Sequence, residues 1–75
     1  MIAYKKLSGN TGVSGYEILK DGIIIRFQDG RTYLYTNRSA GAIAIGQMKQ
    51  LAAAGKGLTT FINRYVKEKY EKRIR

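Results

Sequence analysis

The sequence contains no cysteine, no histidine and no proline among its 75 residues. Without cysteine there are no disulfide bonds or thiolate metal sites, and without histidine the commonest metal ligand and the usual general base near neutral pH are missing. A hydroxyl nucleophile would therefore lack its usual activating partner. We expect a protein that is not an enzyme and that has no catalytic residues, no metal site and no cofactor.

Acidic residues are also scarce, with five Asp and Glu against fourteen Lys and Arg, which gives a formal net charge of +9. Residues 1–37 hold five basic and three acidic side chains (+2), whereas residues 38–75 hold nine and two (+7). Such a field attracts polyanions, and it exceeds the charge of about 2–8 that small domains commonly carry for solubility. We therefore expect a nucleic acid as partner, RNA rather than DNA.

Long apolar segments are absent as well. No run approaches the roughly 20 apolar residues that cross a bilayer, and the N-terminal residues do not resemble a signal peptide. We expect a cytoplasmic protein with no membrane partner, folded as one domain over residues 1–75. Because a chain of this size buries only a thin core, both a monomer and a homodimer remain open.

The first half of the chain carries strand signals. Three runs of apolar and β-branched residues, separated by two Asp-Gly pairs, lie at 16–20, 23–28 and 31–36. Asp-Gly between such runs favours a hairpin, because the glycines at 22 and 30 accept a positive φ. We expect an antiparallel meander of three strands, with a fourth if residues 2–7 also form one, and a loop at residues 8–12.

The second half changes to helical periodicity. Ser39 is placed to cap a helix at residues 40–54, and Gly55 is placed to end it. A threonine then caps a second helix at residues 61–73, whose i,i+4 charge pairs lie on its outer side. Its apolar face is formed by Phe61, Ile62, Tyr65, Val66 and Tyr70. Because both helices are apolar on one side, we expect them to pack on one sheet face, which gives a two-layer α+β domain.

The hairpin at Gly30 leaves two registers open. With a two-residue turn, Tyr33 and Tyr35 lie on the open face of the sheet. That face also carries Arg26 and Arg31, and aromatic rings beside guanidinium groups stack bases and neutralise phosphates in several RNA-binding folds. With a three-residue loop and a glycine bulge, the register shifts by one residue, and both tyrosines become core residues.

Lys56 lies in a glycine-rich turn between the two expected helices. Backbone N–H groups at the start of the second helix, with Lys56 beside them, are a candidate site for one phosphate; the alternative is a plain helix–helix turn. Arg64 and Lys67 on the second helix are further candidate phosphate contacts. The candidate nucleic-acid-binding residues are therefore Arg26, Arg31, Tyr33, Tyr35, Lys56, Arg64 and Lys67.

Several short motifs resemble the KTSC domain, which is named for its occurrence at the C-terminus of some lysyl-tRNA synthetases and also forms small free-standing bacterial proteins. The segments that resemble it are Tyr16-Glu17, the alternating Ile23, Ile25 and Phe27, Gly30, Tyr33-Leu34-Tyr35, and residues 61–66 with Tyr70. The chain departs from the family after Tyr35, where the usual Val-Pro is missing, and at residues 58–60, which lengthen a turn. Contacts that the family makes through these two loops are therefore not carried over. The resemblance implies a domain without an established activity, for which RNA binding has been suggested.

Together these features predict a small, basic, non-catalytic module that binds nucleic acid by its backbone and shape. A protein-interaction module is the alternative, for example a small phage or mobile-element protein that inhibits a host factor. A dimeric accessory protein is a third hypothesis, because a thin core often recruits a second subunit.

Overall fold

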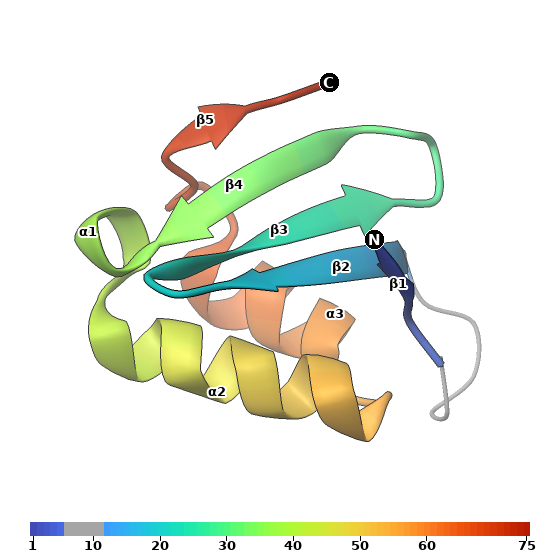
Figure 1. Ribbon diagram of the computed structural model, residues 1–75, viewed down its shortest axis with the longest axis horizontal. Helices are drawn as coiled ribbons and strands as arrows, with labels where there is room; N and C mark the ends of the chain where they lie inside the picture. The colour runs from blue at the N-terminus through green and yellow to red at the C-terminus, as the bar shows by residue number, and fades with distance from the viewer. Residues whose placement is uncertain (6–11) are drawn as a thin grey trace.

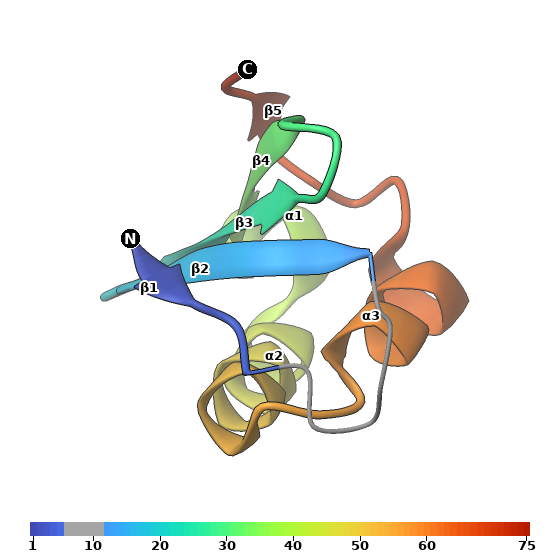
Figure 2. The same ribbon diagram turned by 90° about the vertical axis from the view of Figure 1, so that its right-hand side faces the viewer.

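The computed structural model describes residues 1–5 and 12–75, which form two layers, a five-stranded antiparallel sheet and a layer of helices (Figure 1, Figure 2). The strands follow one another across the sheet in the order of the chain. The expected α+β fold, a strand meander with helices on one sheet face, is confirmed. In chain order the elements are β1 (Ile2–Ala3), β2 (Val13–Leu19), β3 (Gly22–Phe27), β4 (Thr32–Thr36), α1 (Asn37–Ala40), α2 (Ala42–Ala54), α3 (Leu58–Phe61), the π-helix η1 (Ile62–Val66) and β5 (Lys72–Arg73).

Two predicted segments overlap the part of the chain that is not described. The strand expected at residues 2–7 corresponds to β1, which covers two residues and pairs with β2; its last two positions lie outside the described residues. Of the loop expected at residues 8–12, only Gly12 is described.

The turn between β2 and β3 differs from the prediction. Leu19 pairs with Gly22, so the turn consists of Lys20 and Asp21, and Gly22 is the first residue of β3. Gly22 is not one of the glycines with a positive φ. A Cβ atom at this position would overlap the carbonyl oxygen of Tyr35 on the neighbouring strand. Glycine is needed here because two strands approach closely, not because the backbone is left-handed.

The turn between β3 and β4 is a three-residue loop that ends with Gly30. The amide of Phe27 donates to the carbonyl of Arg31 at 2.8 Å, and the amide of Gly30 donates to the carbonyl of Phe27 at 2.9 Å. Gly30 has a φ of 92°, which is the left-handed conformation that such a loop requires. The two-residue turn considered from the sequence is therefore wrong.

This loop sets the register of the two central strands. Ile25 pairs with Tyr33 and Ile23 with Tyr35, so both tyrosines share a sheet face with the buried isoleucines. Arg26 pairs with Thr32 and lies on the opposite face. The second register, with the tyrosines on the core side, is confirmed, and the aromatic platform on the open face of the sheet is wrong.

The helix expected at residues 40–54 corresponds to α2, which begins at Ala42 with Gly41 as its N-cap, and the short helix α1, which was not predicted, precedes it. Ser39 is not an N-cap. Thr36 is the N-cap of α1: its hydroxyl accepts from the Ser39 amide at 3.1 Å, and the Ser39 hydroxyl accepts from the Thr36 amide at 3.0 Å. This reciprocal capping box holds α1 at the end of β4. Gly41, with a φ of 94°, separates α1 from α2. Gly55 is left-handed and ends α2 as predicted.

The second expected helix is much shorter than predicted. It begins at α3, continues as the π-helix η1 and ends at Val66, so the predicted helix over 61–73 is wrong beyond that residue. The chain then turns back and adds β5 to the edge of β4. The amide of Glu71 donates to the carbonyl of Leu34 at 2.6 Å, and the amide of Ile74 donates to that of Thr32 at 2.7 Å. The predicted i,i+4 charge pairs on a helix are lost, because this stretch pairs with the open edge of the sheet instead.

The core lies between the sheet and the helices. The helices contribute about one residue from each turn to it, and the strands contribute one face. The buried apolar residues are Tyr4, Val13, Tyr16, Ile23, Ile25, Tyr35, Ile45, Met48, Ala52, Leu58, Ile62 and Val66. The π-helix η1 buries Ile62 and Val66 and exposes the three residues between them. Two surface hollows lie beside η1, one on each side of it.

Candidate nucleic-acid interface

One of these hollows, the tyrosine pocket, has a volume of about 250 Å³ and lies between β4, η1 and the segment that leads to β5. It lies on the helix side of the sheet, not on the open face. The pocket is lined by Phe27, Arg31, Tyr33, Tyr35, Ile62, Asn63, Lys67, Glu68 and Tyr70. Four of the seven candidate residues, Arg31, Tyr33, Tyr35 and Lys67, therefore come together here.

Four aromatic rings form one wall of the tyrosine pocket. The ring of Tyr70 lies 4.5 Å from that of Tyr33, at an interplanar angle of 42°, and 6.2 Å from that of Tyr35. Phe27 meets Tyr33 edge to face at 5.8 Å. Tyr35 is 1% exposed, whereas Tyr70 is 38% exposed. Tyr70 is thus the most exposed of the four rings, Tyr33 and Phe27 are half-buried, and stacking of a base on Tyr35 is excluded because its ring is covered.

Burial also affects the titration of Tyr35. Loss of solvent around its phenol raises the pKa to about 12, and the neighbouring Tyr33 and Tyr70 act in the same direction. Tyr35 therefore keeps its hydroxyl proton to a higher pH than an exposed tyrosine does. It contributes an uncharged wall to the pocket.

Arg31 stands at the mouth of the pocket and forms an ion pair. Its Nε donates to Oδ2 of Asp29 at 2.7 Å, and its amide donates to Oδ1 at 3.0 Å. The hydrogen bond from that amide lowers the pKa of Asp29, and the carboxylate in turn raises the pKa of Arg31. Both side chains are half-exposed, so the pair contributes little to stability. Asp29 holds the guanidinium in place but offsets part of its charge.

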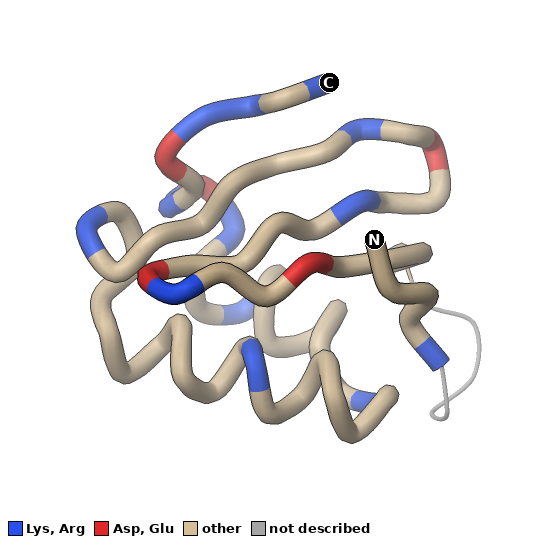
Figure 3. Tube along the Cα trace, in the orientation of Figure 1, with Lys and Arg blue, Asp and Glu red and all other residues tan. Residues whose placement is uncertain are grey.

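Strand β5 brings further cations to this side of the molecule. Arg73 pairs with Tyr33 across the sheet edge, and its guanidinium carbon lies 6.0 Å from the centre of the Tyr33 ring. Arg31 and Lys67 line the pocket and are exposed, whereas Arg73 does not line it and adjoins it through the Tyr33 ring. We call Arg31, Lys67 and Arg73 the basic rim of the pocket. Basic positions also follow one another along β5 and the residues after it (Figure 3), namely Lys72, Arg73 and Arg75.

Three of the predicted site residues lie elsewhere. Arg26 is on the open sheet face, where its Nε donates to the hydroxyl of Ser14 at 3.2 Å. Arg64 is exposed on η1 but does not line the pocket. Lys56 lies in the turn before α3 and does not line the pocket. The sequence thus combined residues from separate surfaces into one site.

The phosphate site expected beside Lys56 is not supported by the geometry. The amide of Leu58, at the start of α3, already donates to the hydroxyl of Tyr4 at 3.1 Å in a buried hydrogen bond. The predicted threonine cap is absent, since Gly57 occupies the N-cap position without a side-chain hydrogen bond. The alternative considered from the sequence, a helix–helix turn, describes this segment.

Tyr70 and Arg73 were missed as site residues. Both lie in the stretch that was predicted to be helical, where Tyr70 would face the core and Arg73 the solvent. A signal was present, because basic and apolar residues alternate at Arg73-Ile74-Arg75. That alternation is as compatible with an edge strand as with a helix end, and only the pairing with β4 distinguishes them.

Over residues 1–5 and 12–75, no cluster of three or more potential metal-ligating side chains is present. Within the same ranges, none of the helices has the length and hydropathy to span a bilayer. The chain matches no family model, no curated protein and no solved structure. The resemblance to the KTSC domain and the assignment to nucleic acid therefore stay predictions.

Proposed function

We propose that the protein is a non-catalytic module that binds single-stranded nucleic acid, RNA in the first place, at the tyrosine pocket and its basic rim. The observation that carries the proposal is the meeting of exposed cations and a reachable tyrosine ring at one hollow. Nonspecific single-strand binding uses this combination, because cations neutralise phosphates and every base has a face that stacks on an aromatic ring.

A single strand fits the pocket better than a duplex does. The rings lie in a hollow between β4 and η1, so only a base that has left its stack can reach Tyr70. In an A-form helix the bases are paired and its deep groove is closed to side chains. Asn63 and Glu68 line the same hollow, and their amide and carboxylate groups are able to hydrogen-bond the edge of an inserted base.

The basic rim sets the expected salt dependence. Neutralisation of about three phosphates by the rim, or about four if Arg75 also takes part, gives a slope of log K against log salt of about −2 to −3 for a single strand. Removal of two of these cations lowers the magnitude of the slope by about 1.4.

The test is fluorescence anisotropy with a labelled, mixed-sequence single-stranded RNA, titrated at several salt concentrations. We expect Lys67→Ala/Arg73→Ala to weaken binding and to reduce the slope. The matched control is Lys5→Ala/Lys56→Ala, which removes the same charge at two exposed positions that do not line the pocket. Equal losses in both double variants would show that only net charge matters and would overturn the proposal.

The aromatic contribution is tested at Tyr70. Tyr70→Leu should lower the affinity by about 5- to 150-fold, which corresponds to the loss of one base–aromatic stack of about 1–3 kcal/mol. Tyr70→Phe keeps the ring and should bind like the wild type. Wild-type affinity in Tyr70→Leu, with its fold confirmed by circular dichroism, would rule out the pocket as the binding site.

A further inference from the structure

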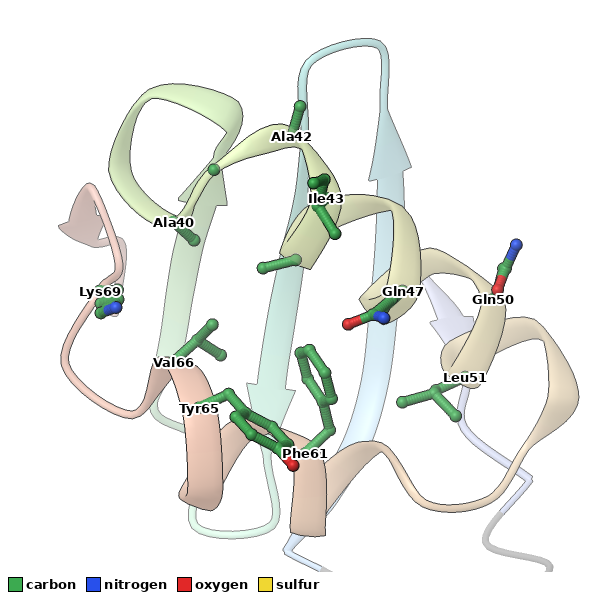
Figure 4. Close-up of a pocket in the computed structure, with 12 residues that line it drawn as sticks. Ala40, Ala42, Ile43, Gln47, Gln50, Leu51, Phe61, Tyr65, Val66 and Lys69 are labelled. Atoms are coloured by element: carbon green, nitrogen blue, oxygen red, sulfur yellow. The ribbon is translucent and has the colours of Figure 1, made fainter.

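The second hollow is a groove of about 940 Å³ between α2 and the helical segment formed by α3 and η1 (Figure 4). It lies on the other side of η1 from the tyrosine pocket. Its apolar walls include Ile43, Leu51, Phe61, Tyr65 and Val66. Among the described residues that line the groove, Lys69 is the one charged side chain, and none is acidic.

An exposed apolar side chain, that of Ile43, projects from the rim of the groove. Ile43 is 82% exposed although it is a large aliphatic residue on α2, and Tyr65 across the groove is 57% exposed. Phe61 lies between them and contacts Tyr65, with ring centroids 5.0 Å apart. Single exposed apolar residues are common on protein surfaces. Here, however, the projection and an apolar hollow belong to one continuous surface, which is the arrangement of an interaction site.

The charge of the chain indicates which partner fits this surface. Two copies that each carry +9 repel one another and are able to approach only through a face without charge. α2 provides such a face, because Lys49 is its single charged residue and the Lys49 Nζ donates to the carbonyl of Lys20 at 3.1 Å. An acidic partner would need a ring of cations around the groove, and the lining offers one, Lys69. A second copy of the chain suits the groove better than a polyanion or an acidic protein.

We propose that two copies of this chain pair across the groove about a two-fold axis. In such an isologous contact the same patch serves both subunits, so the Ile43 side chain of each copy enters the hollow of the other, beside Leu51 and Phe61. Among residues 1–5 and 12–75, Ile43 is the most exposed of the large aliphatic side chains, and the contact removes it from water. The pairing does not depend on nucleic-acid binding.

The geometry leaves the tyrosine pocket open in the dimer, because the groove and the pocket occupy opposite sides of η1. A dimer therefore offers two separate nucleic-acid sites. Two linked sites on one strand raise the apparent affinity through effective concentration, without any new contact.

The test is sedimentation velocity of the full chain over a wide range of protein concentration, at low salt and in about 1 M salt. At about 1 M salt the Debye length is about 3 Å, so repulsion between the copies is screened. We expect a monomer–dimer equilibrium in which the dimer fraction rises with salt, whereas RNA binding weakens with salt. This opposite dependence separates failure of the dimer from failure of the proposed function.

Ile43→Lys should raise the dimer dissociation constant by at least about thirtyfold, the effect expected of a central contact residue. Its fold should be unchanged, because Ile43 is exposed, and its circular dichroism spectrum checks this. The matched control is Ile18→Lys on β2, an isoleucine that is 45% exposed and does not line the groove. A monomeric wild type at every concentration and salt would overturn the pairing and leave the groove to a different protein. Equal losses of the dimer in the two variants would place the contact elsewhere and also overturn it.

Discussion

The close approach of β3 and β4 at Gly22 leads to a prediction about the stability of Gly22→Ala that the sequence pattern alone would get wrong. Gly22 belongs to an Asp-Gly pair, and an alanine in a turn would be expected to cost only the strain of a positive φ. In the structure, the added Cβ of Gly22→Ala overlaps the carbonyl oxygen of Tyr35 and lies 3.2 Å from the Cα of Thr36. Both contacts are with the backbone of β4, which cannot rotate away as a side chain would.

The cost follows from this geometry. Extra volume in a packed interior typically costs about 1–3 kcal/mol, because strands or side chains must shift. The entropy of unfolding scales with length, and for 75 residues it is about 0.16 kcal/mol per degree. We therefore expect Gly22→Ala to lower Tm by about 6–19 °C.

Two other glycines provide matched controls with different physical causes. Gly46 lies in α2, where a Cβ meets nothing within 4 Å, so Gly46→Ala should stabilise the protein by about 1 kcal/mol through helix propensity. Gly30 also has no neighbour within 4 Å, but its φ is 92°. Gly30→Ala should therefore cost about 1–2 kcal/mol through backbone strain alone.

The assay is thermal unfolding followed by far-ultraviolet circular dichroism, with all variants at the same low protein concentration. Guanidinium unfolding at a fixed temperature gives an independent free energy and m-value. The expected order of Tm places Gly46→Ala above the wild type and both Gly30→Ala and Gly22→Ala below it. A Gly22→Ala protein as stable as the wild type would refute the close approach and the register of β3 and β4 with it.

Two further predictions concern buried tyrosine hydroxyls. The pKa of Tyr35 is about 12 in the folded protein and about 10 in the unfolded chain, so its stabilising effect is complete below pH 10 and is lost as the pH rises towards 12. Over that window the free energy of unfolding of the wild type should fall by on the order of 2 kcal/mol more than that of Tyr35→Phe. Equal pH profiles of the two proteins would contradict the burial of the phenol. Tyr4→Phe removes the acceptor for the buried Leu58 amide and should lower the free energy of unfolding by about 1–3 kcal/mol, measured by chemical denaturation. Hydrogen exchange at the Leu58 amide should become faster. Unchanged exchange there would argue against the hydrogen bond.

Local signals predicted a large part of the fold. The three runs separated by the Asp-Gly pairs form β2, β3 and β4, because alternation and β-branched residues favour a strand through interactions among a few neighbouring positions. Gly55 ends α2 for an equally local reason, since a left-handed residue closes the last helical turn. The packing of helices on one sheet face followed from their apolar sides, without knowledge of any particular contact.

The candidate site was only partly predictable. Arg31 and Lys67 were named for their charge, and they do meet at one pocket. Arg26 was named for the same reason, but it lies on the opposite sheet face. The length of the loop before Arg31 decides this, because one additional loop residue shifts the register by one position and so exchanges the two faces of a strand.

The sequence by itself determined the excess of positive charge, the meander of β2, β3 and β4 and the C-terminal end of α2, since each depends on composition or on residues close together in the chain. The tertiary structure alone decided the register of β3 and β4 and the conformation of residues 67–75. The latter stretch has a helical pattern, yet the open edge of β4 offers its backbone hydrogen bonds and Tyr33 offers Tyr70 a ring to pack on. Both β4 and Tyr33 are distant from this stretch in sequence. Such non-local contacts override a local helix propensity of a few tenths of a kcal/mol per residue (about 0.2–0.7).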